Sequence, residues 1–143
     1  MNKQINKQTG FTLIELVVVI VILGILAATA MPKFANLNTD ARKASVKAVV
    51  GTLKSAAALA HAKQLVDGAA SDVSVTLDGN ATVEMLLGYP KKETAGIGNA
   101  VQLSAEITSN GTGTFTIATG CTVSYVDSVG GALPAVSSDM SGC

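Results

Sequence analysis

Few side chains in this sequence could take part in chemistry. Its 143 residues include one histidine, His61, two cysteines, Cys121 and Cys143, and ten carboxylates scattered along the chain. A catalytic or metal site needs several such groups at suitable spacing, and no second ligand accompanies His61. We therefore predict no enzyme activity, no cofactor and no metal site, and we interpret His61 as an ordinary surface residue.

The carboxylate with the most unusual surroundings is Glu15. It is the only charged residue between Lys7 and Lys33, and it lies in an apolar segment from Phe11 to Met31. A carboxylate at the centre of a membrane-spanning helix costs about 2.5–3.5 kcal/mol, and less near a helix end. A residue retained despite this cost usually has a partner, so Glu15 is the strongest candidate functional residue. The alternative is an interfacial residue that reaches toward lipid headgroups.

The segment that carries Glu15 is long enough to cross a membrane. Its twenty-one residues would span roughly 30 Å as a helix, the thickness of one hydrocarbon core. Lys3 and Lys7 precede it and predict a cytoplasmic N-terminus. Three interpretations compete: a signal peptide cut after Ala30, a permanent anchor, and a polar leader cut after Gly10 that leaves the segment in the product. Glu15 favours the third, because signal peptides and plain anchors have no use for a carboxylate.

The order Gly10-Phe11-Thr12-Leu13-Ile14-Glu15, followed by the apolar segment, resembles the processing signature of class III prepilins. That family includes the type IV pilins and the pseudopilins of type II secretion. The longer stretch GFTLIELVVVIVILGILAATAMPKF is more closely similar to pilins of the mannose-sensitive haemagglutinin (MSHA) type. This closer similarity covers roughly the first third of the chain, and the remainder resembles the family in architecture only.

The resemblance implies a role for each matching residue. Residues 1–10 would be a leader that the prepilin peptidase removes by cutting after Gly10, and Phe11 would become the N-methylated first residue. Glu15 would pair with the Phe11 amine of a neighbouring subunit during assembly. Such a pairing is energetically favourable, because a carboxylate in an apolar bundle needs a cation beside it. Removing one partner of a buried ion pair typically costs about 3–5 kcal/mol.

Gly24 and Pro32 are the helix-weakening positions of the apolar segment. Proline lacks an N–H and crowds the preceding turn, so a kink is expected near Pro32. In filaments of the family that this chain resembles, the helix melts between such positions and gives extensibility. Alternatively, Gly24 allows close helix packing and Pro32 marks the membrane boundary, and both interpretations remain open.

The sequence predicts that the helix continues well beyond the apolar segment. From Phe34 to Val66 there is no proline and alanine is frequent, and Gly68 is suited to cap the C-terminus. A helix from about Phe11 to Val66 would be roughly 80 Å long, too long for so small a chain to cover, so its N-terminal half must contact lipid or other copies. The stripe that should face a sheet consists of Val46, Val49, Leu53, Ala56 and Ala60.

A polar stripe follows another face of the same predicted helix. A solvated helix face is the ordinary interpretation of such a stripe. The alternative is a contact between its basic residues and acidic loops of a neighbouring subunit. The members of the stripe are Asp40, Lys43, Lys47, Lys54 and His61.

The residues after Gly68 predict a small antiparallel sheet. Alternating apolar and polar residues indicate strands, and Gly-rich and Asn-rich stretches indicate turns. Together with the helix this gives an α+β fold of the type IV pilin class, in which the C-terminal half of a helix over 11–66 packs on the sheet. The predicted strands are 73–77, 101–108, 114–118 and 122–126, the predicted turns are 78–80 and 110–113, residues 81–87 are either helix or strand, and Lys91-Lys92 lies in a loop.

Cys121 and Cys143 allow one intramolecular pairing. An exported head in an oxidising compartment favours a disulfide, which would contribute roughly 3 kcal/mol in the loop-entropy model. The resemblance implies the same bridge, because type IV pilins close a C-terminal loop in this way and expose it. The alternative is a pair of buried free thiols.

The composition excludes two further classes of protein. Ten basic residues balance ten acidic ones, whereas a nucleic-acid-binding face needs a basic excess. The chain is 48% hydrophobic and 14% charged, which excludes a disordered chain. The length fits one domain.

The sequence therefore predicts the structural major subunit of a type IV pilus of the MSHA type, which serves adhesion and biofilm formation. The predicted organisation is a cleaved leader over 1–10, a membrane and filament-core helix over 11–32, and a globular head over 33–143 with a disulfide loop over 121–143. The expected partners are further copies in a helical filament, the inner membrane before assembly, the prepilin peptidase and the pilus assembly machinery, with no nucleic acid and an unidentified surface receptor.

The expected location is the inner membrane for the precursor and then the extracellular pilus of a Gram-negative bacterium. A type II secretion pseudopilin or minor pilin is the nearest alternative. A soluble exported binding domain, cut after Ala30, is an alternative from another class.

Overall fold

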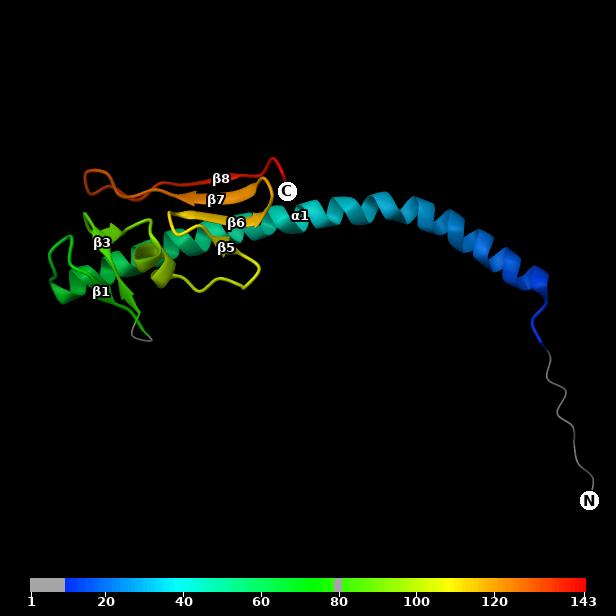
Figure 1. Cartoon of the computed structure of the whole chain (residues 1–143), viewed down its shortest axis with the longest axis horizontal. Helices are drawn as coiled ribbons and strands as arrows, with labels where there is room; N and C mark the ends of the chain where they lie inside the picture. The colour runs from blue at the N-terminus through cyan, green and yellow to red at the C-terminus, as the bar shows by residue number, and fades with distance from the viewer. Residues whose placement is uncertain (1–9, 79–80) are drawn as a thin grey trace, which may run out of the picture. The chain divides into compact units, whose positions relative to one another are not determined.

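A computed structural model describes residues 10–78 and 81–143 (Figure 1). Residues 1–9 of the predicted leader, and Gly79 and Asn80 of the predicted turn, lie outside the described residues. The chain divides into two compact units, one that ends at Asn38 and one from Thr39 to Cys143.

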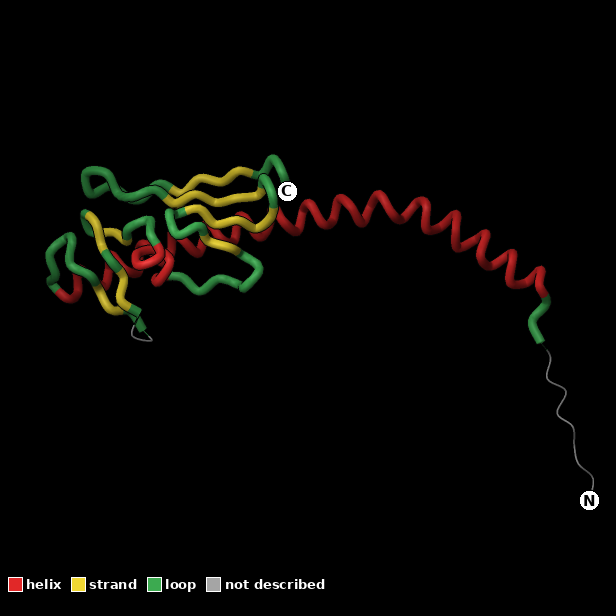
Figure 2. Tube along the Cα trace, viewed as in Figure 1, coloured by secondary structure: helices red, strands yellow, loops and turns green. Residues whose placement is uncertain are grey.

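One helix, α1, runs from Leu13 to Asp67 (Figures 1 and 2). It begins and ends within two residues of the predicted bounds. Gly68 ends it with φ of +62°, a conformation that glycine adopts without strain. The N–H of Gly68 donates to the carbonyl of Leu65, and the N–H of Ala69 donates to that of Gln64. These two bonds satisfy two of the last four carbonyls of the helix in a Schellman motif, so the predicted glycine cap is confirmed.

All the described strands lie after α1 and pair antiparallel. β1 pairs with β2, β3 pairs with β4, and β5 to β8 form a four-stranded sheet in sequence order. This arrangement confirms the predicted α+β fold. The bounds are β1 Val75–Thr76, β2 Thr82–Val83, β3 Met85–Leu86, β4 Tyr89–Pro90, β5 Thr108–Ser109, β6 Thr114–Ala118, β7 Cys121–Tyr125 and β8 Val136–Asp139, with a short π-helix, η1, over Thr94–Gly98.

The core lies between one face of α1 and the four-stranded sheet, which run side by side in Figure 1. Apolar side chains at helical spacing meet alternating apolar side chains of β6 and β7, because each pattern places its apolar residues on one face. The core is aliphatic apart from one phenylalanine, two tyrosines and one cysteine. Its buried members are Val46, Val49, Leu53, Ala56, Ala57, Tyr89, Ile97, Phe115, Cys121, Val123 and Tyr125.

Several strand predictions are confirmed and one is largely wrong. The hairpin over 114–126 forms, and in the predicted turn before it the Asn110 side-chain oxygen accepts bonds from the N–H groups of Thr112 and Thr114. Residues 101–107 are irregular, and the strand begins at Thr108. Their alternating pattern arises because Val101, Leu103 and Ile107 pack against the core without a partner strand.

Other parts of the sheet differ from the sequence-based expectation in extent. The strand expected over 73–77 is limited to Val75–Thr76, and residues 81–87 form the ends of two short hairpins rather than a helix. The sequence did not predict β8, whose residues are mostly exposed and polar. It also did not predict η1, because a five-residue helix leaves no periodic pattern.

Candidate assembly site

Glu15 lies in the first turn of α1 and is hydrogen-bonded to Thr12. The N–H and the hydroxyl of Thr12 donate to Oε2 of Glu15 at 2.8 and 2.7 Å, and the N–H of Glu15 donates back to the Thr12 hydroxyl at 3.4 Å. Thr12 is the residue before the helix, so this is a capping box, which satisfies two of the N–H groups that a helix start leaves without partners. The carboxylate also lies at the positive end of the helix dipole.

The sequence-based reasoning missed this capping box, although its signal is present. The pattern is Thr, two apolar residues and Glu, directly before an apolar run. The prediction for Glu15 rests on the cost of a carboxylate inside a membrane and includes no local partner. The structure therefore gives Glu15 a role in starting α1 in addition to any role in assembly.

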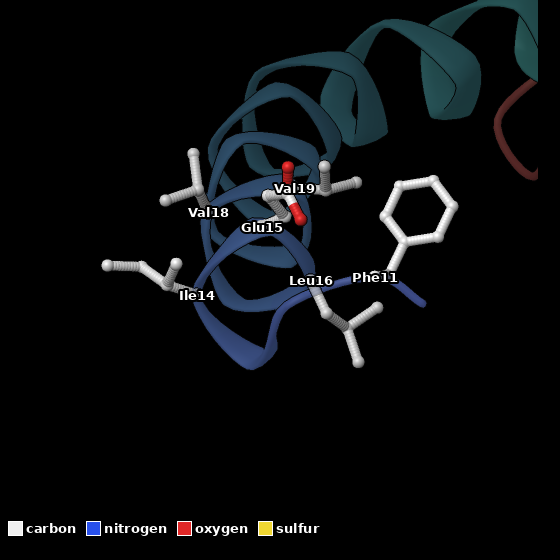
Figure 3. Close-up of a pocket in the computed structure, with 6 residues that line it drawn as sticks. All are labelled: Phe11, Ile14, Glu15, Leu16, Val18 and Val19. Atoms are coloured by element: carbon white, nitrogen blue, oxygen red, sulfur yellow. The ribbon is translucent and has the colours of Figure 1, made fainter. Parts of the chain in front are cut away.

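The segment around Glu15 exposes apolar side chains on every side of the helix. Phe11 is 93% exposed and Ile14 is 70% exposed. A helix that is apolar all round belongs inside lipid or inside a bundle of helices. Among the described residues, α1 is the one helix long and apolar enough to cross a membrane. The residues that surround Glu15 and line an open apolar concavity with it are Phe11, Ile14, Leu16, Val18 and Val19 (Figure 3).

Gly24 and Pro32 both lie inside α1, which continues through them. Pro32 has no N–H to donate to the carbonyl of Ala28, so one helix bond is lost there. A Cβ atom at Gly24 would meet no atom of this chain within 4 Å. No contact within the described part of the chain therefore requires glycine at this position.

Cys121 and Cys143 form a disulfide across 22 residues. Cys121 is fully buried in the core, and Cys143 packs against the same core. The bridge fixes the last residue of the chain to β7 and closes a loop that contains β8. This is the pairing that the sequence predicted.

His61 contacts the β3–β4 hairpin and is half-buried, unlike the surface residue expected from the sequence. Its Nδ1 lies 2.6 Å from the carbonyl oxygen of Gly88, and because a carbonyl only accepts, Nδ1 donates. The ring stacks on Tyr89 with centroids 4.4 Å apart. His61 therefore joins α1 to the hairpin.

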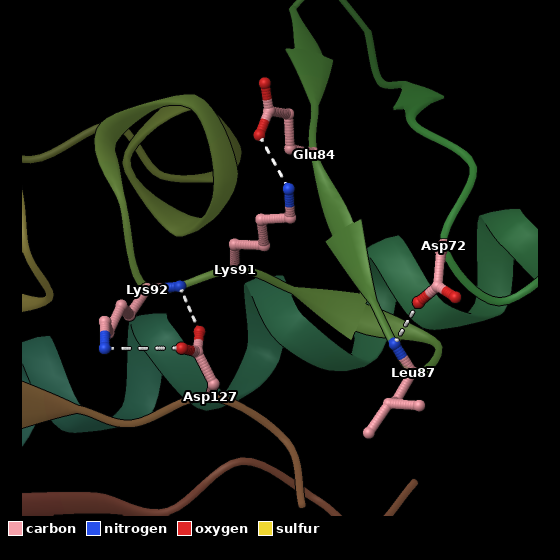
Figure 4. Close-up of polar contacts among 6 residues, drawn as sticks. All are labelled: Asp72, Glu84, Leu87, Lys91, Lys92 and Asp127. Atoms are coloured by element: carbon pink, nitrogen blue, oxygen red, sulfur yellow. Dashed lines mark hydrogen bonds and ion pairs between the residues drawn. The ribbon is translucent and has the colours of Figure 1, made fainter.

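Polar contacts hold the segment between β3 and η1 in place (Figure 4). The Lys92 N–H donates to Oδ1 of Asp127 at 2.6 Å, and the Lys92 amine lies 3.5 Å from Oδ2. The Lys91 amine donates to Glu84 at 3.1 Å, and this bond, together with the charge of Glu84, raises the pKa of Lys91. The contacts with Asp127 tie the segment to the loop after β7, and the contact with Glu84 ties it to the residue before β3.

A hairpin tip in this segment has an unusual backbone. Leu87 has φ of +52° and Gly88 has φ of +90°, the pair of left-handed residues that a two-residue hairpin turn requires. The Asp72 carboxylate accepts a bond from the Leu87 N–H at 2.8 Å. This bond helps to hold leucine in a conformation that it rarely adopts.

The beginning of the chain matches a known protein family. The model of the prokaryotic N-terminal methylation motif matches residues 5–31. These residues include the Gly10–Phe11 junction and Glu15. No solved structure matches the chain significantly.

Several relatives are pilus proteins. The chain is 30% identical to a fimbrial protein of Pseudomonas aeruginosa over 119 residues, which cover 67% of this chain and 77% of the relative. It is 50% identical to the type IV narrow pilus major component PilA5 of Thermus thermophilus over 54 residues, which cover 38% of this chain and 47% of the relative. The latter match therefore spans about half the length of the Thermus protein.

A secretion protein is also similar. The type II secretion system core protein G of Pseudomonas aeruginosa is 44% identical over 54 residues, which cover 35% of this chain and 38% of the relative. The named relatives are structural components of pili or of a secretion system and not enzymes.

Proposed function

The chain belongs to the type IV pilin family, and we propose that it is the structural major subunit of a type IV pilus of the MSHA type. One observation supports this proposal above others: the first turns of α1 are apolar and exposed on all sides. Such a surface cannot remain in water, and twenty or so helical residues match one membrane thickness. A bundle of identical helices covers the same surface once the subunit has left the membrane.

Processing of the precursor prepares the helix for its transfer from the membrane into a bundle of helices. In our proposal residues 1–10 are a leader, the prepilin peptidase cuts after Gly10, and Phe11 becomes an N-methylated first residue. Cutting there creates an amine at the start of α1, two residues before its first helical residue. The N-methyl amine stays cationic, so the product carries a positive charge close to the carboxylate of Glu15.

Glu15 then guides docking into the filament. Its Oε2 is bonded to Thr12 in the single chain, and in the filament we propose that the carboxylate pairs with the Phe11 amine of a neighbouring subunit. An unpaired carboxylate inside an apolar bundle would cost several kcal/mol. Docking is therefore stable only where the neighbouring subunit places a cation beside Glu15. This requirement fixes the register of docking.

The remaining organisation follows from this route. Residues 11–32 form the membrane and filament-core helix, and residues 33–143 form the head, whose loop over 121–143 is closed by the disulfide. The precursor resides in the inner membrane of a Gram-negative bacterium. The assembly machinery, driven by a separate ATPase, moves the subunit into an extracellular pilus that serves adhesion and biofilm formation.

A type II secretion pseudopilin or minor pilin is the second candidate. The similarity to a core protein of that secretion system favours it. Against it stands the disulfide-closed C-terminal loop, which in the family is a feature of pili. A soluble exported domain cut after Ala30 is the third candidate, and in that case Glu15 would be absent from the product.

The experiment is an intact-mass measurement of protein sheared from the cell surface. The proposal expects a chain that begins at Phe11 and carries one extra methyl group. Deletion of the gene should remove abundant surface filaments. A secretion defect with no surface filaments would instead support the pseudopilin, and a chain that begins at Met31 would rule out both assembly proteins.

A further inference from the structure

Positive and negative charges are separated within the residues that follow the apolar segment. From Lys33 to Asp67 there are six basic and two acidic side chains. From Gly68 to Cys143 there are two basic and seven acidic side chains. Residues 33–67 therefore have an excess of four positive charges, and residues 68–143 have an excess of five negative charges.

Ion pairs inside the chain use only part of these charges. Lys63 pairs with Asp67 on α1, Lys91 pairs with Glu84, and Lys92 pairs with Asp127. Asp72 and Asp139 accept bonds from backbone N–H groups. In the described part of the chain, no ion pair is formed by Lys43, Lys47, Lys54, Glu93 or Glu106.

The three lysines of this set, Lys43, Lys47 and Lys54, form one surface, which is called the basic flank of α1. Their spacings of four and seven residues place them along one side of the helix over about 16 Å. Lys47 and Lys54 are exposed and Lys43 is half-buried. The buried residues of α1, among them Val46 and Leu53, occupy a different side of the helix from the three lysines, as 3.6 residues per turn requires.

Two glutamates after the helix, Glu93 and Glu106, are exposed and form no ion pair within the described residues, and they are together called the acidic segment. Glu93 directly precedes η1, and Glu106 lies in the irregular stretch before β5. Both side chains are exposed. The neighbouring Lys91 and Lys92 are engaged by Glu84 and Asp127.

We propose that the basic flank of one copy contacts the acidic segment of a second copy. The inference rests on the proposed function, because it assigns a contact between subunits of the filament. Charge complementarity identifies a second copy as the partner. Each copy carries both halves of the contact, and within the described residues neither half forms an ion pair. Complementary charge steers the approach of two surfaces and fixes their register.

The two surfaces are different, and this determines the kind of assembly. A contact between unlike surfaces leaves one of each exposed at the two ends, so copies add without closing unless a rotation forms a ring. Exposed ion pairs are individually weak and are screened by salt. The contact therefore selects the register of the heads, while burial of the apolar segment supplies most of the stability.

Charge reversal in cells tests the contact. We expect Lys47→Glu with Lys54→Glu to lower the amount of sheared surface protein at least threefold, with normal total protein and a normal disulfide. Glu93→Lys with Glu106→Lys should have the same effect, and the four substitutions together should restore filaments. Lys63→Glu is the matched control on the same helix, because Lys63 is already paired with Asp67, and it should leave the yield unchanged.

The outcomes distinguish failure of the proposed function from failure of the proposed contact. Wild-type cells without filaments would refute the proposed function itself. Wild-type filaments with reversals that have no effect would overturn the contact and leave the function standing. A loss that the fourfold variant does not restore would also overturn it, and would indicate that the basic flank contacts another partner, such as anionic lipid headgroups.

A measurement on wild-type filaments avoids mutation altogether. A carbodiimide joins a lysine amine to a carboxylate only where the two are in contact. In sheared filaments we expect peptides of the basic flank joined to peptides of the acidic segment, as found by mass spectrometry. The same joined peptides should be absent from protein dissociated in detergent, and their absence from intact filaments would overturn the contact.

Discussion

At the scale of single residues, the observed cap and the proposed ion pair of Glu15 would use the same oxygen atoms. In one chain its Oε2 accepts both the N–H and the hydroxyl of Thr12. Pairing with a neighbour's amine requires that the carboxylate turn toward that neighbour or share its oxygens. The capping box therefore keeps the carboxylate hydrogen-bonded before assembly, when no neighbour is present.

Replacing Glu15 separates charge from hydrogen bonding. Glu15→Gln keeps an oxygen that can accept bonds from Thr12 and removes the charge. We expect leader cleavage to continue and the amount of sheared filament to fall at least tenfold, because the neighbour's amine is left without a counter-charge. Immunoblots of the sheared and cell-bound fractions give both quantities.

Thr12→Ala is the matched comparison for this variant. It removes the cap, which typically costs about 1 kcal/mol, and leaves the carboxylate in place. Its filament yield should fall less than that of Glu15→Gln. The opposite order would mean that helix capping, and not charge pairing, is the main role of Glu15.

The buried hydroxyl of Tyr125 makes the stability of the head depend on pH. Its hydroxyl is buried and donates to the carbonyl of Pro90 at 2.8 Å, and burial raises its pKa above the usual value of 10.0. The unfolded chain loses this proton first as the pH rises, so the stabilising contribution is complete below pH 10 and declines above it. We expect the free energy of unfolding to fall between about pH 10 and 12.

Tyr125→Phe removes this titration. The variant should lose about 1–3 kcal/mol at pH 7, since it leaves the buried carbonyl of Pro90 without its donor. Its stability should then fall less steeply with alkaline pH than that of the wild type. Denaturant unfolding of the full chain in detergent at a series of pH values measures both effects, and parallel curves would contradict the assignment to Tyr125.

The sequence alone predicts the surroundings of some of these residues and not of others. Glu15 stands out because its position inside an apolar run is rare and costly. The surface position predicted for His61 is wrong, since its partners Gly88 and Tyr89 are more than 25 residues away. A tertiary contact of this kind leaves no local pattern.

At the scale of elements, α1 contains two positions that no contact within the described residues explains. Glycine costs about 1 kcal/mol and proline about 3 kcal/mol relative to alanine inside a helix. A Cβ atom added at Gly24 would have no neighbour within 4 Å, and Pro32 removes a helix bond. Both positions therefore need a reason outside the described contacts, and the alternatives are melting in the filament, close helix packing at Gly24 and a membrane boundary at Pro32.

Substitution at both positions tests melting of this part of α1. We expect amide hydrogens of residues 25–31 to exchange faster in wild-type filaments than those of residues 46–60, and to be slowed at least tenfold by Gly24→Ala with Pro32→Ala. The same variant in detergent serves as control, because α1 is continuous in the single chain. Equal protection of the two regions in wild-type filaments would favour close packing over melting.

The disulfide cross-links the four-stranded sheet covalently. It joins β7 to the last residue of the chain across 22 residues, and such a closure contributes about 3 kcal/mol. We expect Cys121→Ala with Cys143→Ala to lower the Tm by at least about 10 °C, since 1 kcal/mol corresponds to several degrees in a domain of this size. Calorimetry of oxidised, reduced and substituted protein checks this, and an unchanged Tm would assign stability to the core alone.

Long periodic elements are predictable from the sequence and short ones are not. α1 and the hairpin of β6 and β7 have many residues that repeat one pattern, so their bounds follow closely. Residues 101–107 show the same alternation because they pack on the core, yet they form no strand. β8 is an edge strand with exposed polar residues, which gives it the composition of a loop.

At the scale of the whole molecule, the core and the apolar segment are built from separate residues. The buried members of the core all lie between Val46 and Tyr125. The residues of α1 from Leu13 to Leu26 are exposed. The buried contacts of the core therefore come from residues after Asn38, and we expect these contacts to supply the free energy of folding, while residues 11–38 supply the surface that needs lipid or other copies.

Removal of residues 1–38 tests this separation. The shortened chain would begin with Thr39 and Asp40, which are suited to the start of a helix because a side-chain oxygen can accept N–H bonds and a carboxylate favours the positive end of the dipole. We expect it to be soluble without detergent, monomeric by light scattering, and to unfold within about 5 °C of the full chain. The full chain should need detergent or a filament to stay in solution. Aggregation or unfolding of the shortened chain would show that the first part of α1 supports the head, and the apolar segment would then serve folding as well as assembly.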